Sequence, residues 1–258
     1  MKIIVFKWKP LLFSGAAAAI LVSLFCFAAT PKLISAFSSS NGRSLPIYSV
    51  QTEEKKIALG FNCAWDDADI PSLLSTLDAC DVKATFFLLG EWARKYPDTA
   101  KLIALSGHEI GSHSNTHRDM DTLSSEEIRS EINDSRNNIY TACGQTPVLF
   151  RPPSGSYNDL VIDTIHQCGC IPIQWSIDTL DWQGLDTEQM VARVQQQLAP
   201  GAILLLHAGA QHTAQALPQL LQAIQDAGYT PVPVGELIYP DSNLVDHTGK
   251  QLPLGNNK

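Results

Sequence analysis

Short apolar runs alternate with helical patterns along most of this chain. The strand-like runs are 57–61, 84–89, 148–150, 171–175, 202–206 and 231–234. Between them, apolar residues recur every three or four positions at about 70–80, 91–106, 124–142, 158–168, 187–198 and 214–227. Short strands that alternate with helices predict an α/β fold with parallel strands joined by crossover helices. The pattern alone leaves an open sheet and a barrel as alternatives.

Local signals mark the ends of several predicted helices. Pro71 stands in the first turn of one helix, and Pro97 divides the pattern of 91–106 into two pieces. Ser124 and Glu127 have the spacing of a capping box, and Gly144 is suited to end the helix that follows. We therefore expect one long helix over about 124–142.

The first thirty residues have a different pattern. Three lysines precede a run from Leu11 to Ala29 that contains no charged residue. A basic flank before such a run is typical of a signal peptide or a signal anchor. The run is longer than the apolar part of most cleaved signals, so we expect residues 1–30 to be a membrane anchor, with a signal peptide as the alternative. Either one places the rest of the chain outside the cytoplasm.

The remaining sequence predicts one folded domain. Residues 31–52 are expected to form a linker and an entry segment. The first part, to about Ser44, is rich in serine and small residues, which is typical of a flexible linker, and the rest is expected to be extended. Residues 53–240 carry the alternating pattern, and residues 241–258 are polar and predict a flexible tail. At 258 residues and 45% hydrophobic content, the chain can bury one substantial core.

Charge and cysteine count restrict the partners. The formal net charge is −8, which argues against nucleic-acid binding and favours a neutral or cationic ligand. Of the six cysteines, five lie beyond the N-terminal apolar run, and an odd number cannot pair completely within one chain. We expect a monomer whose cysteines are mostly buried thiols.

Candidate chemistry is concentrated after the strand-like runs. His113 and His117 are four residues apart, which on one side of a helical turn would let both imidazoles bind one divalent metal. The spacing alone is a weak signal, because surface histidines often have it by chance. Further polar motifs follow later runs: Arg151-Pro152-Pro153-Ser154-Gly155, Asp178-Thr179-Leu180-Asp181-Trp182 and Leu204-Leu205-Leu206-His207.

This ordered set of motifs resembles the polysaccharide deacetylases, the NodB-like carbohydrate esterase family four, over about residues 45–237. The opening Leu45-Pro46-Ile47-Tyr48-Ser49-Val50 and the Ala64-Trp65 loop resemble the sporulation-associated branch. The resemblance implies a distorted (β/α) barrel of about seven parallel strands, with the site at their carboxyl ends. It also implies a metal-dependent N-deacetylase that acts on acetamido groups of a cell-wall or spore-cortex glycan, in the cell or spore envelope.

The resemblance assigns a role to each motif. His113 and His117 correspond to the metal ligands, for which Zn²⁺ is the expected ion and Co²⁺ the alternative. His207 corresponds to the general acid, and its imidazole suits proton donation near neutral pH. Asp178 corresponds to the residue that orients His207, and Arg151 to the arginine that pairs with the catalytic base. Without the other motifs, His207 and Asp178 would be interpreted as an ordinary strand end and a loop aspartate.

Three further residues are expected to contact substrate. The backbone N–H of Ser154 would help to bind the oxyanion, and such a donor does not depend on the side chain. Trp182 would form a wall of the sugar groove, and Leu205 lies beside the general-acid histidine in the same motif. The expected substrate is therefore an N-acetylated glycan.

The motif after the first strand departs from the family. Family enzymes carry two aspartates there, a base and a metal ligand, whereas this chain has Asn62 and Cys63. An asparagine amide accepts no proton at neutral pH, so Asn62 cannot act as the base. The third metal ligand is open among Asp66, Asp67 and the Cys63 thiolate. We expect a weakened deacetylase; the alternatives are a catalytically inactive glycan-binding wall protein and an amidohydrolase of a small molecule.

Overall fold

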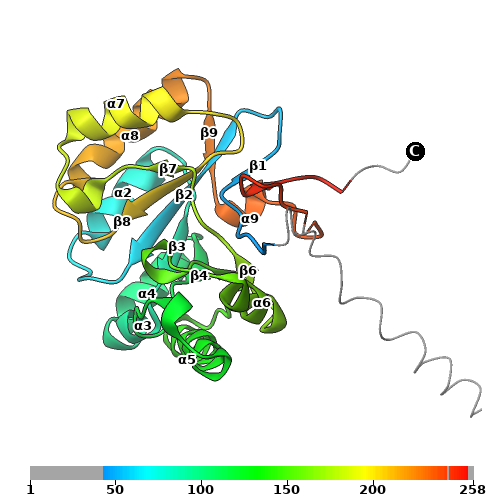
Figure 1. The fold of residues 1–258 in the computed structure, drawn as a ribbon. Coiled ribbons are helices and arrows are strands. Elements are labelled where there is room, and N and C mark those ends of the chain that lie inside the picture. The colour runs from blue at the N-terminus through cyan, green and yellow to red at the C-terminus, as the bar shows by residue number, and fades with distance from the viewer. Residues whose placement is uncertain (1–42, 243, 255–258) are drawn as a thin grey trace, which may run out of the picture. The chain divides into compact units, whose positions relative to one another are not determined.

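The computed structural model describes residues 43–242 and 244–254, which include the whole alternating α/β pattern (Figure 1). The predicted membrane anchor or signal peptide, residues 1–30, lies outside the described residues. Among the helices that are described, none has both the length and the apolar content needed to cross a membrane.

A parallel sheet forms the centre of the described domain. Its strand order is β6-β5-β4-β3-β2-β8-β7, and β9 also pairs with β2. The strands are β2 (Lys56–Cys63), β3 (Thr85–Leu88), β4 (Glu109–Ser112), β5 (Leu149–Phe150), β6 (Ile171–Pro172), β7 (Ile177–Asp178), β8 (Ile203–His207) and β9 (Thr230–Val232). The sheet curls into a half-barrel with helices around it, which confirms the predicted distorted (β/α) barrel (Figure 1).

Continuous burial explains why these strands need helices on the outside. All residues of β2 after Lys56 are buried, as are all four residues of β3. Strands whose two faces are both covered read as continuous apolar runs rather than as alternating ones. The pairing also fixes the register: Asn62 at the end of β2 lies opposite Phe87 of β3 and His207 of β8.

The helices lie close to their predicted ranges. They are α2 (Ile70–Ala79), α3 (Gly90–Lys95), α4 (Pro97–Leu105), α5 (Ser125–Cys143), α6 (Asp159–Gln167), α7 (Thr187–Gln197), α8 (Thr213–Asp226) and α9 (Val234–Leu237). Pro97 begins α4, and the Ser124–Glu127 capping box and Gly144 at φ 76° bound α5 as the sequence predicts. Helices α2, α8 and α7 pack in one row, and α3, α4, α5 and α6 pack in another (Figure 1).

Three features differ from the sequence prediction. The four-residue strand β4 lay in no predicted strand, because its sequence Glu-Ile-Gly-Ser has only one large apolar residue. The two-residue strand β7 lay in no predicted strand, because two residues give no periodic signal. The tail predicted to be flexible is partly ordered: β10 (Lys250–Gln251) pairs with β1 (Ser49–Val50), and the buried Gln251 side chain donates to the carbonyl oxygens of Tyr239 and Ser242. For residues 244–254 the prediction of a loose tail is therefore wrong, since β10 pairs with β1, Gln251 is hydrogen-bonded, and Val245 packs against the core.

Candidate active site

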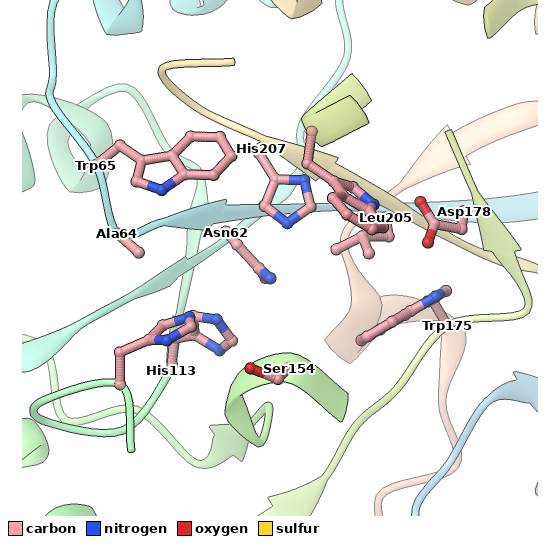
Figure 2. A pocket seen from close by; sticks show the side chains of 11 residues that line it. Asn62, Ala64, Trp65, His113, Ser154, Trp175, Asp178, Leu205 and His207 are labelled. Carbon is pink, nitrogen blue, oxygen red and sulfur yellow. The ribbon is translucent and has the colours of Figure 1, made fainter. Parts of the chain in front are cut away.

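A pocket of about 310 Å³ opens at the carboxyl ends of the strands (Figure 2). Its walls come from the ends of β2, β7 and β8 and from the loops that follow β4 and β5. This is where parallel α/β folds place their sites, because the loops there converge. The lining residues are Asn62, Ala64, Trp65, His113, His117, Ser154, Trp175, Asp178, Trp182, Leu205 and His207.

The two histidines come together, but not on a helical turn. They lie in a loop after β4, and Ser114 and His117 have φ values of 71° and 64°. The expectation of a helical turn at 113–117 is therefore wrong, because left-handed backbone at two positions interrupts any helix. The imidazole ring centroids are nonetheless 5.1 Å apart, with the rings at 79° to each other.

A buried glutamate on α5 holds this loop in its unusual conformation. Glu131 accepts hydrogen bonds from the backbone N–H groups of Asn115 and Thr116, both at 2.9 Å, and from the hydroxyls of Ser114 and Thr116, both at 2.5 Å. Despite the opposing effect of burial, these donors lower the pKa of Glu131. A charged acceptor with four donors offsets the cost of the left-handed backbone.

The bond made by His113 fixes how its ring is presented to the pocket. Its Nδ1 lies 2.7 Å from the carbonyl oxygen of Arg151, which can only accept, so Nδ1 carries the proton. The unprotonated Nε2 is then available as a ligand. Burial, followed by the nearby His117, lowers the pKa of His113 well below its ordinary value and keeps the imidazole neutral. A neutral ring oriented by a carbonyl is the usual state of a metal-binding histidine.

The proposed third ligands lie elsewhere. Cys63 is the last residue of β2, and its side chain points into the core, where burial raises the pKa of its thiol well above the ordinary value. Asp66 accepts from the Ala68 backbone N–H, and Asp67 accepts from the hydroxyl of Thr99 at 2.5 Å. None of the three lines the pocket, so the structure contradicts each as a ligand placed beside the histidine pair.

The residues present fit a metal only in part. His113 and His117 supply two nitrogen ligands, whereas a tetrahedral zinc site with one open position needs three protein ligands. Within residues 43–242 and 244–254, no group of three or more His, Cys, Asp or Glu side chains is placed to hold a metal ion.

Arg151 lies behind the pocket, where it contacts Asn62, and it has no carboxylate partner among the residues that the structure describes. It is fully buried, and it donates to the oxygens of Gly60 (3.2 Å), Asn62 (3.0 Å) and Gln174 (3.4 Å). Its Nε has no hydrogen-bond partner in the described part of the chain, and its guanidinium carbon lies 4.0 Å from the Phe87 ring centroid. Burial alone lowers the pKa of Arg151 to about 9, which still leaves the side chain charged at neutral pH. The arrangement is that of a buried cation that lacks its counter-charge.

The arginine determines which way the Asn62 amide points. A guanidinium only donates, so the Asn62 atom that faces it must be Oδ1. The amide nitrogen then faces the pocket, and Figure 2 shows it directed toward the space between His113, Ser154 and His207. A hydrogen-bond donor therefore occupies the place where the family resemblance led us to expect a proton acceptor.

Asp181, and not Asp178, orients His207. Its Oδ1 lies 2.8 Å from Nδ1 of His207, and its Oδ2 accepts from the His207 backbone N–H and from the Thr213 hydroxyl, both at 2.7 Å. Nδ1 of His207 is thus a donor to a buried carboxylate, and Nε2 is left for the pocket. Asp178 instead accepts from the Leu180 backbone N–H at 2.8 Å, so the predicted pairing of Asp178 with His207 is wrong.

The remaining predicted residues do lie around the pocket. Ser154 is exposed in a short 3₁₀ turn after Pro153, with φ 55°, and Leu205 lies in the wall formed by β8. Asp178 and Trp182 line the pocket too, and half of the Trp182 surface is exposed.

Two aromatic residues of the pocket were not predicted to belong to it. Trp65 stacks on the imidazole of His207, with ring centroids 5.4 Å apart and an angle of 28° between the planes. Trp175 lies across the pocket beside Ser154 and Asp178 (Figure 2). The available signal was that Trp65 follows the strand-like run 57–61 and Trp175 ends the run 171–175, because side chains at strand ends line such sites.

Comparisons with known proteins identify relatives of this arrangement. A profile described as polysaccharide deacetylase matches residues 49–172. The Bacillus cereus peptidoglycan-N-acetylglucosamine deacetylase is 33% identical over 196 residues, which cover 74% of this chain and 92% of that protein. The Bacillus subtilis protein YlxY is 36% identical over 193 residues, or 75% of this chain and 60% of YlxY. The chain spans only 45% of the Listeria monocytogenes peptidoglycan-N-acetylglucosamine deacetylase PgdA.

Solved structures include a relative that lacks activity. The chain is similar to a CE4 family pseudoenzyme from Bacillus anthracis, with 36% identity, a TM-score of 0.73, and coverage of 76% of this chain and 69% of that one. A mutant of that pseudoenzyme with restored enzymatic activity matches with a TM-score of 0.72 at 36% identity, covering 76% of this chain and 71% of the mutant.

Proposed function

Because this chain belongs to the polysaccharide deacetylase family, we propose that it binds an N-acetylated glycan of the cell wall or spore cortex and hydrolyses its acetamido groups slowly. Relatives named as deacetylases of peptidoglycan N-acetylglucosamine and N-acetylmuramic acid support this substrate class. We also propose that the N-terminal apolar run holds the monomeric domain outside the cytoplasm, at the cell or spore envelope.

The proposal depends on one observation: at position 62 a hydrogen-bond donor, the Asn62 amide, replaces the expected catalytic base. The Asn62 amide nitrogen can hydrogen-bond the acetyl carbonyl oxygen or the attacking water, but Asn62 cannot remove a proton from that water. General-base assistance contributes roughly 10²–10⁴-fold to rate, so its loss leaves binding in place and slows hydrolysis by about that factor. The proposal is thus binding with weak turnover.

The other half of the proton chemistry is retained. With Nδ1 donating to Asp181, a protonated His207 presents Nε2–H to the pocket, where it can donate a proton to the departing amine. The buried carboxylate of Asp181 accepts from Nδ1 of the histidine and holds its ring in place. The stacked Trp65 covers one face of the same ring.

His113 and His117 would hold a divalent ion, with Zn²⁺ as the expected metal and Co²⁺ as the alternative. When bound, such an ion supplies Lewis-acid polarisation of the acetyl group and an activated water. With two protein ligands, this chain should bind Zn²⁺ more weakly than a site with three.

Acetate release from N-acetylated chito-oligomers and peptidoglycan tests the proposal, with Zn²⁺ or Co²⁺ supplied. We expect slow release by the natural sequence and a gain of about 10²–10⁴-fold in Asn62→Asp, in which Arg151 regains a carboxylate partner. The double variant Asn62→Asp with His207→Ala is the control and should lose the gain. No release by any variant, at any metal concentration, would count against a deacetylase.

A second candidate function is a catalytically inactive glycan-binding protein of the wall. It is favoured by the uncompensated Arg151 and by the likeness to a pseudoenzyme. Three results together would support this second function. The natural protein would bind acetylated glycan in a pull-down, it would release no acetate, and the His207→Ala variant would bind the glycan equally well.

A further inference from the structure

Residues 44–50, the entry segment, run along one edge of the sheet and reach the loop that carries Ser154. The strand order ends at β6, and the backbone of Ile47 pairs with this edge. The Ile47 N–H donates to the carbonyl oxygen of Pro172 at 2.9 Å, and the Ile47 carbonyl oxygen accepts from the N–H of Gln174 at 2.7 Å. The entry segment thus lies beside the strand end that leads into the pocket wall.

Tyr48 makes the contact with the loop. Its hydroxyl oxygen lies 3.0 Å from the hydroxyl oxygen of Tyr157, so one hydroxyl donates and the other accepts, and the two rings meet edge to face with centroids 6.5 Å apart. Burial, followed by the hydrogen bond to Tyr157, raises the pKa of Tyr48, so its hydroxyl stays protonated. Because this hydrogen bond is partly buried, water competes with it less than at an exposed site.

The C-terminal segment holds Tyr48 in place. The Tyr48 N–H donates to the carbonyl oxygen of Gly249 at 2.8 Å, and the residues that follow pair as β1 with β10 (Figure 1). Gly249 has φ 82°, and a Cβ there would overlap the Tyr48 ring, so glycine is needed for the ring to lie against this turn. Tyr48 therefore presents its hydroxyl from a fixed backbone.

The loop that Tyr48 contacts has a backbone that needs support. Ser154 has φ 55° and Gly155 has φ 69°, and left-handed backbone is uncommon for a serine. Such a conformation persists only where the surrounding structure holds it. Ser156 donates to Oδ1 of Asp121 at 2.5 Å, and the next residue is Tyr157. Two side-chain attachments directly after the turn therefore hold it in place.

We propose that Tyr48 is a positioning residue for the candidate active site, which through Tyr157 fixes the turn at Ser154 and thereby the backbone N–H of Ser154. The proposal rests on the deacetylase function proposed above, in which this N–H binds the oxyanion. It adds that a residue of the entry segment, 109 positions before Tyr157 in the chain, sets the place of that donor. A donor that is already in place stabilises the transition state without reorganisation during the reaction.

Hydrogen exchange measures this positioning without any activity. Tyr48→Phe keeps the ring and loses the hydroxyl, so the Ser156 amide, which donates to the carbonyl oxygen of Pro153 at 2.9 Å, should exchange about fivefold faster. The matched control is Tyr239→Phe. The Tyr239 hydroxyl donates at 2.9 Å to the carbonyl oxygen of Gln51, just after the entry segment, and its loss should leave exchange at Ser156 unchanged.

Acetate release in the Asn62→Asp background measures the consequence for the reaction. Removal of an oxyanion donor typically lowers kcat by about 10²–10³-fold, so a displaced donor should lower kcat roughly tenfold, with KM little changed. Tyr157→Phe should have the same effect as Tyr48→Phe. Combining the two should be no worse than either alone, because both remove one hydrogen bond. Tyr239→Phe should leave kcat unchanged.

Two results would overturn the positioning role and leave the proposed function standing. One is unchanged exchange at Ser156 in Tyr48→Phe, and the other is a kcat for Tyr48→Phe equal to that of Tyr239→Phe. If Asn62→Asp releases no acetate, the proposed function fails, and exchange at Ser156 decides by itself whether Tyr48 holds the loop.

Discussion

Asn62 differs from aspartate by an NH₂ group in place of one oxygen, and this small change alters the electrostatics of the pocket floor. Arg151 remains fully buried with its charge, yet its nearest side-chain partner is neutral. Since the pKa of Arg151 falls only to about 9, the protein bears the desolvation cost of a charged group at neutral pH. A carboxylate at position 62 would offset that cost.

We therefore expect Asn62→Asp to raise the melting temperature near pH 7. Arg151 would hold the pKa of the new carboxyl below its ordinary value of about 3.9, so the gain is present above that pH. It should be lost as the pH falls further and the carboxyl is protonated in the folded state. Thermal unfolding at pH 7 and at pH 3 measures this. Asn133→Asp, at an exposed position of α5, is the control and should change stability little.

At the scale of elements, α5 positions the loop that carries His113 and His117, although α5 contributes nothing to the pocket wall. Its buried Glu131 reaches the backbone of the loop between His113 and His117, which has left-handed residues at both ends. The loop geometry thus depends on a side chain 14 residues or more further along the chain.

Glu131→Gln is predicted to destabilise the fold by about 2 kcal/mol, because an amide cannot accept from all four donors and leaves buried groups unpaired. It should also weaken Zn²⁺ binding, measured by calorimetry with the metal alone, by roughly 10–100-fold. Glu126→Gln, at an exposed position in the first turn of the same helix, is the matched control. Unchanged Zn²⁺ affinity in a folded Glu131→Gln variant would show that the loop holds its shape without this residue.

For the whole molecule, two histidines outside the pocket make folding sensitive to acid. Burial lowers the pKa of His108 and of His166 to about 4 each, from an ordinary value of 6.5. Below pH 6.5 the unfolded chain takes up protons that the folded protein cannot, so the free energy of unfolding should fall as the pH drops from 6.5 toward 4. Above pH 6.5 these groups cause no such dependence.

Urea unfolding at pH 7, 6 and 5 checks this dependence. His108→Asn should keep an acceptor for the Ala84 backbone N–H and reduce the slope with pH by about half. His247→Asn, at an exposed position, should leave the slope unchanged. A slope that is the same in the natural sequence and in His108→Asn would contradict the assignment.

Local order was largely predictable, because apolar periodicity, proline positions and caps act over a few residues. The parallel α/β architecture, the division at Pro97 and the capping box of α5 all followed from the sequence. The family resemblance implied a site at the carboxyl ends of the strands, and His113, Asn62 and His207 do line one pocket there. The absence of a base at position 62 also needed only the residue type.

Pairings between distant loops were decided only by the tertiary structure. Asp178 and Asp181 belong to one motif, and the sequence does not show which of them contacts His207. The left-handed backbone at Leu180 brings Asp181 to the imidazole. Strand register turns Cys63 into the core and Asn62 toward Arg151, which no spacing of residues reveals. Sequence determines which groups are present and the local conformations they favour, whereas contact between them depends on backbone directions that the whole fold sets.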